Sequence, residues 1–542
     1  MVARGVLENP EPYFNPSLKA LREKGMAFED AYLEQLQEAG LTILQGDPDT
    51  PLNEERTVQG MQEGVDVIFQ AQLKSDKWEG RADFLRKVDV PSKLGDWSYE
   101  VWDTKLATTT KVSTIVQIGL YSQRIAEIQG AEPEFMRVIK PNGEDEYRYH
   151  DYAAYIRLLQ RRFEASLLAD TETYPEPVAH CDICRWWKKC NAQRRADDHL
   201  TFTAGMGKNQ IAELKAQQIT TLARLAEQPN PVSFTPQRGR VHTFNGLRDQ
   251  AKIQKYSRDN NFERLHQLLP LEEGRGLYLL PEPNEHDIFL DFEGTRMVEP
   301  DGLDYLIGYY YQGEYTALWA KNEKEEVEIF KQFVSWAYKL WQKEPGLHIY
   351  HYAPYETTAL KRLMGKYVTY ENEIDEFLRG KVFVDLYRVL RQSLIASVER
   401  YSLKDLEPFF GYEREMDLRM VSGPKSAFEY LLEIGKPEEA VPADLEVIER
   451  YNQDDCRALI SLQDWLEDIR AQEEKKGHEI PRPEPEPAEA SEKITEHQKR
   501  IQPLVDSLLE DVPVIQVNGS YMKAALHCIP GINMLRIKNL YE

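Results

Sequence analysis

Four acidic residues and one tyrosine recur at spacings that could gather their side chains around a pair of metal ions. Asp291 and Glu293, in the stretch FLDFEG, lie on one face of an expected strand, because alternate side chains of a strand share a face. Glu356 begins an expected helix, and Tyr451 and Asp455 lie four residues apart on one face of another. Buried carboxylates are costly unless they are paired or bind a cation. Two divalent ions held in this way suit hydrolysis of a phosphodiester, with Tyr451 orienting the water.

A second group nearer the N-terminus could support the same chemistry. Asp83 lies in the strand-like stretch GRADFL, and Asp103 and Lys105 lie two residues apart in another, YEVWDTKLA. Carboxylates hold Mg²⁺ or Mn²⁺, and a lysine could orient the nucleophile or neutralise the charge that develops on the phosphate. Gln117 and Tyr121 share one face of the following expected helix and could position a nucleic acid. The tripeptide D-x-K is common, so a surface ion pair is the alternative interpretation.

The stretch CDICRWWKKC concentrates three of the five cysteines, namely Cys181, Cys184 and Cys190. Metal sites built from thiolates usually use four ligands. Candidates for a fourth ligand are the adjacent His180, which would suit zinc, and the distant Cys456 and Cys528. Thiols that bind no metal are the remaining alternative. So few cysteines do not form a disulfide framework, which favours a reducing cytoplasm.

The elements that must position these residues form two α/β patterns. At 542 residues the chain is too long for one core, so we expect two or three domains. The expected domains are an α/β domain with its cysteine cluster over residues 1–200, a helical connector over 201–275, a second α/β domain over 276–472, and a Pro/Glu-rich linker with an unassigned tail over 473–542. Helices are expected at residues 15–40, 112–130, 150–169, 323–342, 444–470 and 494–511.

Charge and hydropathy limit the partners. The net charge is −24, yet residues 205–265 carry ten Lys/Arg against five Asp/Glu, a local excess that could bind nucleic acid. Residues 205–228 predict two short helices around a turn, either a helix-hairpin-helix element that touches a nucleic-acid backbone or a plain spacer. The sequence has no run of 18 apolar residues and no apolar segment at its start, so we expect neither a membrane span nor a secretory signal.

The order GRADFL, DTK and QIGLY resembles the RecB-like branch of the PD-(D/E)xK nucleases. The resemblance implies a restriction-endonuclease-like fold for the first domain and a catalytic, metal-binding role for the residues of these motifs. RecB-like sites often use a histidine on the first helix as a metal ligand. This chain has Phe28 at that place, and the neighbouring Glu29 could substitute, unless the helix is simply amphipathic.

Iron–sulfur members of this branch, including the CRISPR-associated exonucleases, carry three cysteines after the nuclease core and one before it. The spacing Cys181-x2-Cys184-x5-Cys190 fits the trailing three, so the resemblance implies a [4Fe–4S] cluster. No cysteine precedes Cys181 in the sequence. The expectation is therefore either a truncated start or a lost cluster.

The order of these motifs resembles that of the DEDD 3′–5′ exonucleases, which have a ribonuclease-H-like fold. The motifs are D-x-E on a strand, an acid after a later strand, and Y-x3-D on a late helix. The tyrosine places the resemblance in the subclass that uses tyrosine rather than histidine. Glu356 departs from the aspartate that is usual there, and Asp454 is an alternative to Asp455. Asp385, in VFVDLYRV, is expected to be structural.

Residues 15–511 together resemble bacterial nucleases that join a RecB-like domain to a ribonuclease-H-like exonuclease domain. Relatives often continue into a superfamily 1 helicase, and this sequence lacks the GxxxxGK[ST] phosphate loop. We therefore expect a chain truncated at both ends relative to those relatives, with a helicase as a separate partner. The expected function is metal-dependent hydrolysis of DNA, single-stranded or at ends, in repair or processing. The alternatives are a catalytically degenerate DNA-binding or helicase-accessory scaffold, and an RNA-directed 3′–5′ exonuclease.

Overall fold

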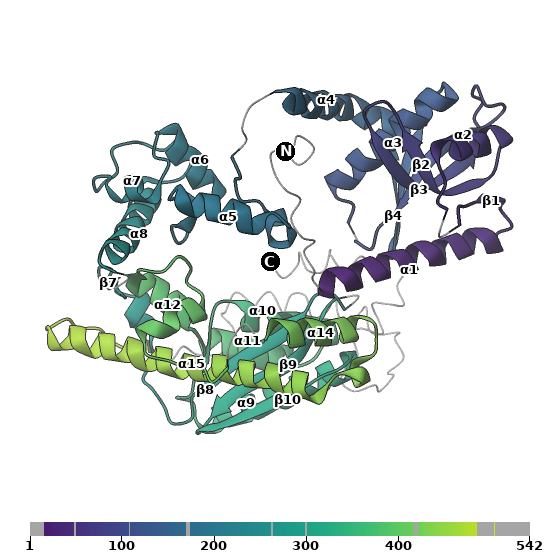
Figure 1. The fold of residues 1–542 in the computed structure, drawn as a ribbon. Coiled ribbons are helices and arrows are strands. Elements are labelled where there is room, and N and C mark those ends of the chain that lie inside the picture. Colours follow the sequence, from purple (N-terminus) through teal and green to yellow (C-terminus); the bar gives the residue numbers. More distant parts are fainter. Residues whose placement is uncertain are drawn as a thin grey trace. The chain divides into compact units, whose positions relative to one another are not determined.

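The computed structural model describes residues 16–484 except 48–49, 108, 170–173, 262–263, 299–300 and 417–420, and also residue 503. The expected helix over 494–511, the tail and Cys528 therefore lie outside the described residues, apart from residue 503. The chain divides into two compact units, an N-terminal unit over Phe14–Glu176 and a C-terminal unit that begins at Pro177. Both units mix helices with a sheet, which confirms the α/β class (Figure 1).

The N-terminal unit is built on a six-stranded sheet in the order β1-β2-β3-β4-β5-β6. Strands β1 and β2 are parallel, as are β4 and β5, and the other neighbours are antiparallel. The elements are α1 (Pro16–Glu38), β1 (Ile43–Leu44), α2 (Glu54–Glu63), β2 (Val67–Lys74), β3 (Glu79–Val88), β4 (Ser98–Thr104), α3 (Val112–Gln129), β5 (Phe135–Lys140), β6 (Gly143–Arg148) and α4 (Tyr149–Leu168).

Two apolar clusters hold helices to this sheet. Leu33 and Leu36 of α1 pack with Phe84 of β3 in one cluster. Met61 of α2 and Ile118 of α3 belong to the other cluster, with residues of β2 to β5. Helix α1 therefore packs on the sheet through one cluster, and α2 and α3 pack on it through the other. The apolar residues of these helices recur on one helical face, which explains why that face packs against the sheet.

The ladder between β2 and β3 is interrupted at one position. Its register runs along Val67–Lys74 but skips Gln70, whose φ of 53° lies in the left-handed region. Asp83 on β3 is opposite the skipped residue. Gln70 and Asp83 therefore do not pair as the neighbouring residues of the ladder do, and the pleat is irregular at this position.

The helical connector belongs with the C-terminal unit. Its elements are η1 (Ala179–Ile183), α5 (Trp187–Ala196), η2 (Leu200–Phe202), α6 (Lys208–Ala216), α7 (Leu222–Ala226) and α8 (Val241–Asp259). Leu214, Leu222 and Phe244 share one buried cluster, so α6, α7 and α8 form a small core of their own. Gln250 of α8 donates to the carbonyl of Ala396, 2.8 Å away. The boundary between the two units thus falls after Glu176, upstream of the boundary at residue 200 that the sequence suggests, and the cysteine segment lies in the C-terminal unit.

The main sheet of the C-terminal unit has five strands in the order β10-β9-β8-β11-β12. Strands β8, β9 and β10 are antiparallel, whereas β11 is parallel to β8 and β12. The elements are β7 (His266–Leu268), η3 (Gly276–Leu279), β8 (Ile288–Thr295), β9 (Leu303–Tyr311), β10 (Glu314–Trp319), α9 (Glu323–Lys343), β11 (Ile349–His351), α10 (Tyr355–Tyr367), α11 (Glu371–Arg379), β12 (Phe383–Asp385), α12 (Leu386–Ser393), β13 (Leu394–Ala396), α13 (Leu403–Leu406), η4 (Glu407–Phe409), α14 (Ser422–Glu433), η6 (Pro437–Glu439) and α15 (Pro442–Lys475). Strands β7 and β13 pair separately.

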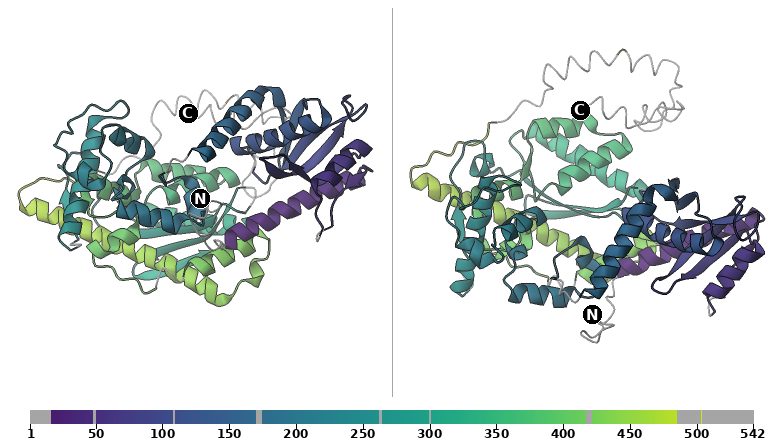
Figure 2. Two further views of the ribbon diagram at one scale, coloured as in Figure 1. Left: turned by 45° about the horizontal axis from the view of Figure 1, so that its top comes forward. Right: turned by 90° about the horizontal axis from the view of Figure 1, so that it is seen from above.

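Helices cover both faces of this sheet. Leu290 and Phe292 pack with α9, α10 and α11, whereas Phe289 packs with α12 and α15. The long helix α15 runs along β8 and β9, as Figures 1 and 2 show. Because Asp291 and Glu293 alternate with Leu290 and Phe292, their side chains face α15.

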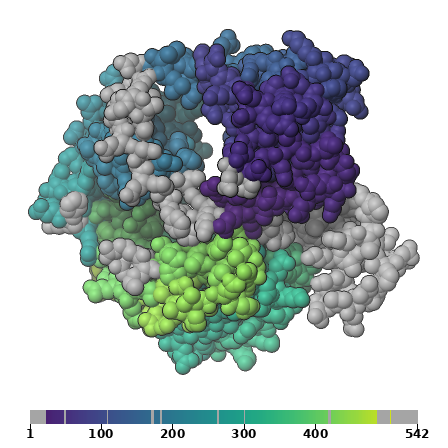
Figure 3. All heavy atoms as spheres, turned by 45° about the vertical axis from the view of Figure 1, so that its right-hand side comes forward, coloured from purple at the N-terminus to yellow at the C-terminus, as the bar shows by residue number. Residues whose placement is uncertain are grey.

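Helix α14 packs on α15, and in the space-filling view of Figure 3 the yellow-green atoms of this region lie against the teal and green atoms of the preceding elements. Phe428 of α14 is buried against Tyr305 of β9, with ring centroids 5.3 Å apart. Among the described residues, no helix is both long enough and apolar enough to cross a membrane.

Candidate active site

Strand β8 delivers two carboxylates to one side of the sheet and then breaks its register. The register with β9 shifts between Glu293 and Gly294. A side chain at Gly294 would collide with the carboxylate of Asp304 and the hydroxyl of Tyr355. The sequence FLDFEG therefore ends its regular pairing directly after the second acid.

Helix α15 brings a third carboxylate to the same place. One carboxylate oxygen each of Asp291, Glu293 and Asp455 lie within 4.8 Å of one another. In the part of the chain that the structure describes, this is the one group of three His, Cys, Asp or Glu residues gathered so closely. Asp454 points elsewhere, because its carboxylate accepts a hydrogen bond of 2.7 Å from the hydroxyl of Tyr412. The geometry thus selects Asp455 over its neighbour.

Crowding of negative charge in a buried place dominates the electrostatics of this site. Burial raises the pKa of Asp291 well above its ordinary value, and the charges of Asp455, Glu293 and Glu356 raise it further. Burial also raises the pKa of Glu293, against the opposing charge of Lys425. A divalent cation would relieve this repulsion. The donors are all carboxylate oxygens, which is the ligand chemistry that Mg²⁺ and Mn²⁺ prefer, so the residues fit such an ion.

Glu356 approaches the site from the first turn of α10. Its carboxylate is buried and lies outside the closely gathered three, 3.4 Å from Nδ1 of His351 at the end of β11. Between them, Ala353 adopts a left-handed φ of 65° and donates its N–H to Asp385 over 2.9 Å. Asp385 also accepts a bond from the N–H of Arg388 and so caps α12. Asp385 therefore holds the loop that leads to Glu356, a structural role.

Tyr451 lies one helical turn before Asp455 on α15. Burial raises the pKa of its phenol, and the charges of Asp455 and Glu293 raise it further. The phenol therefore stays protonated at neutral pH and can donate a hydrogen bond, but it does not act as a base.

Three cations that the sequence interpretation missed surround this tyrosine. They approach its ring centroid to 4.7, 5.5 and 5.9 Å and are, in that order, Lys404, Arg414 and Lys425. Nζ of Lys425 lies 2.6 Å from a carboxylate oxygen of Glu293, and Nζ of Lys404 lies 3.3 Å from Asp455. Arg414 also pairs with Asp455. These residues come from three separate segments, so no local spacing signalled them.

Asn452 is a second residue that was missed. Its amide donates to the carboxylate of Asp291 over 2.8 Å and to the carbonyl of the same residue over 3.1 Å. Tyr315 donates in turn to the amide oxygen of Asn452 over 2.8 Å. Asn452 fits there because position 308 on β9 is glycine, where a side chain would collide with its amide. Its place three residues before Asp455, on the same helical face, was a signal that could have identified it.

The expected acids of the N-terminal unit also come together. Asp83 accepts hydrogen bonds from the N–H and hydroxyl of Thr104, at 2.9 and 3.0 Å. Asp103 is fully buried and pairs with Lys105. Burial and the charge of Asp83 raise the pKa of Asp103 to about 7, although Lys105 acts in the opposite direction.

Helix α1 adds Glu29 to this group. Burial and then the charge of Asp83 raise the pKa of Glu29 to about 7. Gln70, the residue that the β2–β3 ladder skips, donates a hydrogen bond to its carboxylate. The geometry therefore brings Glu29 to Asp83, as expected if it substitutes for the usual histidine. Among the described residues, these acids are not gathered as closely as the three of the C-terminal unit.

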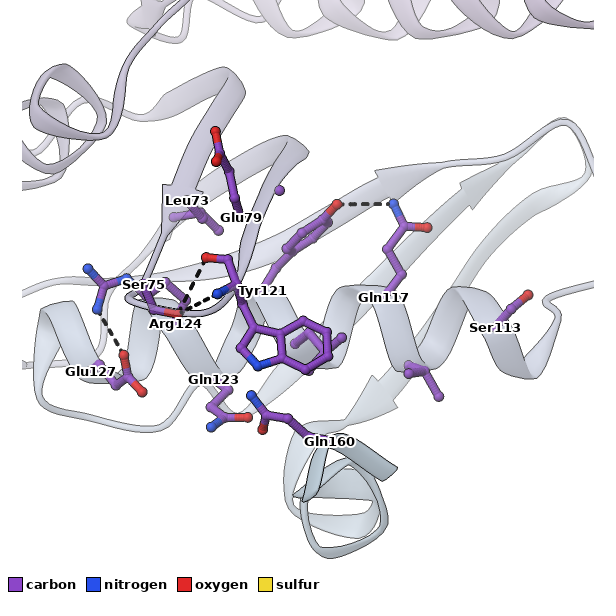
Figure 4. Close-up of a pocket in the computed structure, with 14 residues that line it drawn as sticks. Leu73, Ser75, Glu79, Ser113, Gln117, Tyr121, Gln123, Arg124, Glu127 and Gln160 are labelled. Carbon is purple, nitrogen blue, oxygen red and sulfur yellow. Dashed lines mark hydrogen bonds and ion pairs between the residues drawn. The ribbon is translucent and has the colours of Figure 1, made fainter. Parts of the chain in front are cut away.

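Gln117 and Tyr121 lie side by side on α3, where the Gln117 amide donates to the Tyr121 hydroxyl over 3.3 Å. Both line a pocket of about 360 Å³ beside the β2–β3 hairpin. Figure 4 shows the pair and Arg124 on the same helix, with Gln160 opposite. Tyr121 packs over Gly80, where any larger residue would collide with the ring.

The cysteine segment gathers no such site in the structure. Cys181 and Cys184 lie in and directly after η1, Cys190 lies in α5, and all three are half-buried free thiols. Among the described residues, they and His180 do not form a close group of ligands. Cys456 is buried in α15 and donates to the carbonyl of Gly308, 3.5 Å away. The iron–sulfur and zinc interpretations stay predictions.

A family model of the RNase H superfamily matches residues 288–467. The match begins with β8 and ends within α15, so it includes the carboxylate group, Glu356 and Tyr451 but not the three cysteines of the C-terminal unit. This part of the chain is therefore an RNase H-like domain, which confirms the fold expected for it and is compatible with nuclease or phosphodiesterase activity in general. A search of curated proteins found no match.

Proposed function

We propose that the RNase H-like domain is a metal-dependent exonuclease that hydrolyses DNA, single-stranded or at ends, in repair or processing. The observation that carries this proposal is the close group of Asp291, Glu293 and Asp455, whose oxygens lie within 4.8 Å on the α15 side of β8. The ion pairs of Glu293 and Asp455 offset part of the repulsion among these carboxylates, and a divalent cation would offset the rest. A 3′–5′ polarity is part of the proposal and rests on the resemblance to the DEDD exonucleases.

Asp291, Glu293 and Asp455 would hold Mg²⁺ or Mn²⁺, and Glu356 would complete the ligand set. A bound divalent ion would stabilise negative charge on the phosphate and promote ionisation of a water. The protein itself contributes orientation. Asn452 fixes the Asp291 carboxylate, and the protonated Tyr451 hydroxyl can donate to a water or phosphate oxygen.

A second nuclease in the N-terminal unit is supported by its own geometry. Glu29 and Asp83 come from α1 and β3, and Asp103 and Lys105 from the end of β4, which together match what the RecB-like resemblance implies. In this proposal Gln117 and Tyr121 position the strand beside that site. The same resemblance also implies a [4Fe–4S] cluster at the three cysteines, although no cysteine precedes Cys181 in the sequence to supply a fourth ligand, and a superfamily 1 helicase as a partner.

DNA is proposed over RNA on the basis of the resemblance, and the connector supplies the expected electrostatic contact. Residues 205–265 carry ten basic against five acidic residues. Binding through them should weaken as salt rises, because neutralised phosphates release counterions.

Degradation of end-labelled single-stranded DNA and RNA in Mn²⁺ tests the proposal. Wild type is compared with Asp291→Ala, Asp103→Ala and the control Asp454→Asn, whose carboxylate is held by Tyr412 instead of facing the site. Loss of all activity in Asp291→Ala alone supports one working nuclease in the RNase H-like domain. Loss of a distinct product ladder in each alanine variant supports two nucleases. A wild type that degrades neither polymer overturns the proposal in favour of a binding scaffold.

A further inference from the structure

The three cations around Tyr451 differ in how firmly they are held. Arg414 is almost completely buried, with 7% of its side chain exposed, and it binds both Glu407 and Asp455. Lys404 and Lys425 are 32% and 31% exposed, and each makes one ion pair with a carboxylate of the site. The arginine is therefore fixed by two partners, whereas each lysine has one described ion pair and a side chain that is about one-third exposed.

The partners of the two lysines are the residues proposed to bind metal. Lys425 pairs with Glu293, and Lys404 pairs with Asp455, which are two of the three residues that each offer one carboxylate oxygen to the group within 4.8 Å. A divalent cation at these oxygens would compete with both ammonium groups. Since the lysine stems are flexible, a displaced ammonium group could reach an oxygen of a nearby phosphate.

Both lysines also lie over the ring of Tyr451, at 4.7 Å for Lys404 and 5.9 Å for Lys425. They come from different elements, α13 and α14, so two separate segments of the chain bring positive charge to this ring. A phosphodiester placed beside the carboxylates would therefore meet a positive charge from either element.

We propose that Lys404 and Lys425 are the phosphate-binding residues of the RNase H-like site, and that they exchange their carboxylate partners for the nucleic-acid backbone when a divalent cation binds. This inference rests on the proposed function. It adds which residues bind the substrate. It also assigns these lysines opposite effects on the affinity for the divalent cation and on the affinity for the nucleic-acid strand. They oppose the cation and attract the strand.

The test measures metal and nucleic acid separately in Lys404→Met and Lys425→Met, using the full chain. Methionine keeps an unbranched stem and removes the charge. Lys436→Met is the matched control, because Lys436 follows α14 and its described ion pair is with the exposed Glu439 instead of a carboxylate of the site. Titration calorimetry with MnCl₂ alone gives the metal affinity. Binding of a fluorescent phosphorothioate oligonucleotide, which resists hydrolysis, is then measured in Mn²⁺ over a series of salt concentrations.

We expect each active-site variant to bind Mn²⁺ several-fold more tightly than wild type, and to bind the oligonucleotide more weakly. The dependence of log affinity on log salt should become shallower by about 0.7 for each phosphate of a single strand that the variant no longer neutralises. Lys436→Met should match wild type in Mn²⁺ affinity. These opposite signs support the proposal, because a merely structural lysine would not strengthen metal binding.

Two results overturn it. If wild type binds Mn²⁺ and degrades DNA but both lysine variants behave as Lys436→Met does, the inference fails and the proposed function stands. If the variants bind Mn²⁺ more weakly, the lysines help to build the metal site and the inference also fails. A wild type that neither binds Mn²⁺ nor degrades nucleic acid overturns the proposed function itself.

Discussion

The amide of Asn452 donates to the carboxylate of Asp291 over 2.8 Å, and so joins the last long helix of the RNase H-like domain to its central strand. The same amide group accepts from Tyr315, which fixes which way it faces. Asn452 therefore sets the orientation of Asp291, a candidate metal ligand. It lies on the same helix as Asp455, another candidate ligand, three positions before it.

Replacing Asn452 by Ala should weaken metal binding and activity together. The Asp291 carboxylate would lose its only described amide donor and could rotate, and loss of such an orienting partner typically costs 10–100-fold. Titration with MnCl₂ and the rate of DNA degradation check this. Tyr315→Phe should change both in the same direction but less, since Asn452 would remain. An unchanged Mn²⁺ affinity in Asn452→Ala would show that Asp291 needs no such support.

Gly308→Ala should impair the site without touching a charged residue. The added methyl group would collide with the amide oxygen of Asn452, and such overpacking costs about 1–3 kcal/mol. We expect a lower free energy of unfolding and weaker Mn²⁺ binding. Gly365→Ala is the control, because position 365 lies in α10 with open space around it, and alanine there should leave both unchanged or stabilise the helix slightly. Equal behaviour of the two variants would refute the close packing at position 308.

His348 should make the protein sensitive to mild acid. Burial lowers the pKa of its imidazole from 6.5 to about 4, so the folded state prefers the neutral ring. The unfolded chain binds a proton near pH 6.5, hence stability is complete above that pH and falls as pH decreases toward 4. The loss is at most about 3 kcal/mol. Urea unfolding of wild type and His348→Gln between pH 7 and 4 checks this, and parallel profiles would contradict it.

Asp103 should have the opposite pH dependence. With its pKa raised to about 7 by burial and by Asp83, the folded state prefers the protonated acid. Stability is complete below the ordinary value of 3.8 and is lost as pH rises through 7. In a chelator, Asp103→Asn should therefore be more stable than wild type at pH 8, by at most about 4 kcal/mol, with a smaller difference of about 1–2 kcal/mol at pH 5 and near equality only below about pH 4. If the variant is less stable at pH 8, the pair with Lys105 outweighs the burial of charge.

Local spacing carried much of what the sequence could predict. The strand with Asp291 and Glu293 and the helix with Tyr451 and Asp455 follow from periods of two and about four residues, which depend only on backbone geometry. The same holds for the helix over residues 16–38, which the apolar spacing predicts over 15–40. The short strands β1 and β6 and the helix α2 were not expected, because their apolar patterns are too brief to stand out.

Tertiary packing decided the rest. Lys404 and Lys425 reach the carboxylates from segments whose approach depends on how α13 and α14 pack, which no spacing encodes. Gln70 adopts a left-handed φ that glycine, not glutamine, usually signals, so the break in the β2–β3 ladder was invisible in the sequence. The sequence allows two interpretations of the first helix, in which Glu29 either substitutes for the usual histidine or simply belongs to an amphipathic helix. The fold brings Glu29 to Asp83.

The crowding around Gly294 affects what the residues retained in related domains would indicate. Asp304 and Tyr355 fill the space beside it whether or not the neighbouring acids do chemistry. A related domain without the proposed activity could replace Asp291 and Glu293, yet it would still need glycine at position 294 as long as it kept Asp304 and Tyr355. Retention of that glycine in a divergent copy would therefore report the packing of the fold, whereas retention of the two acids would report the proposed metal site.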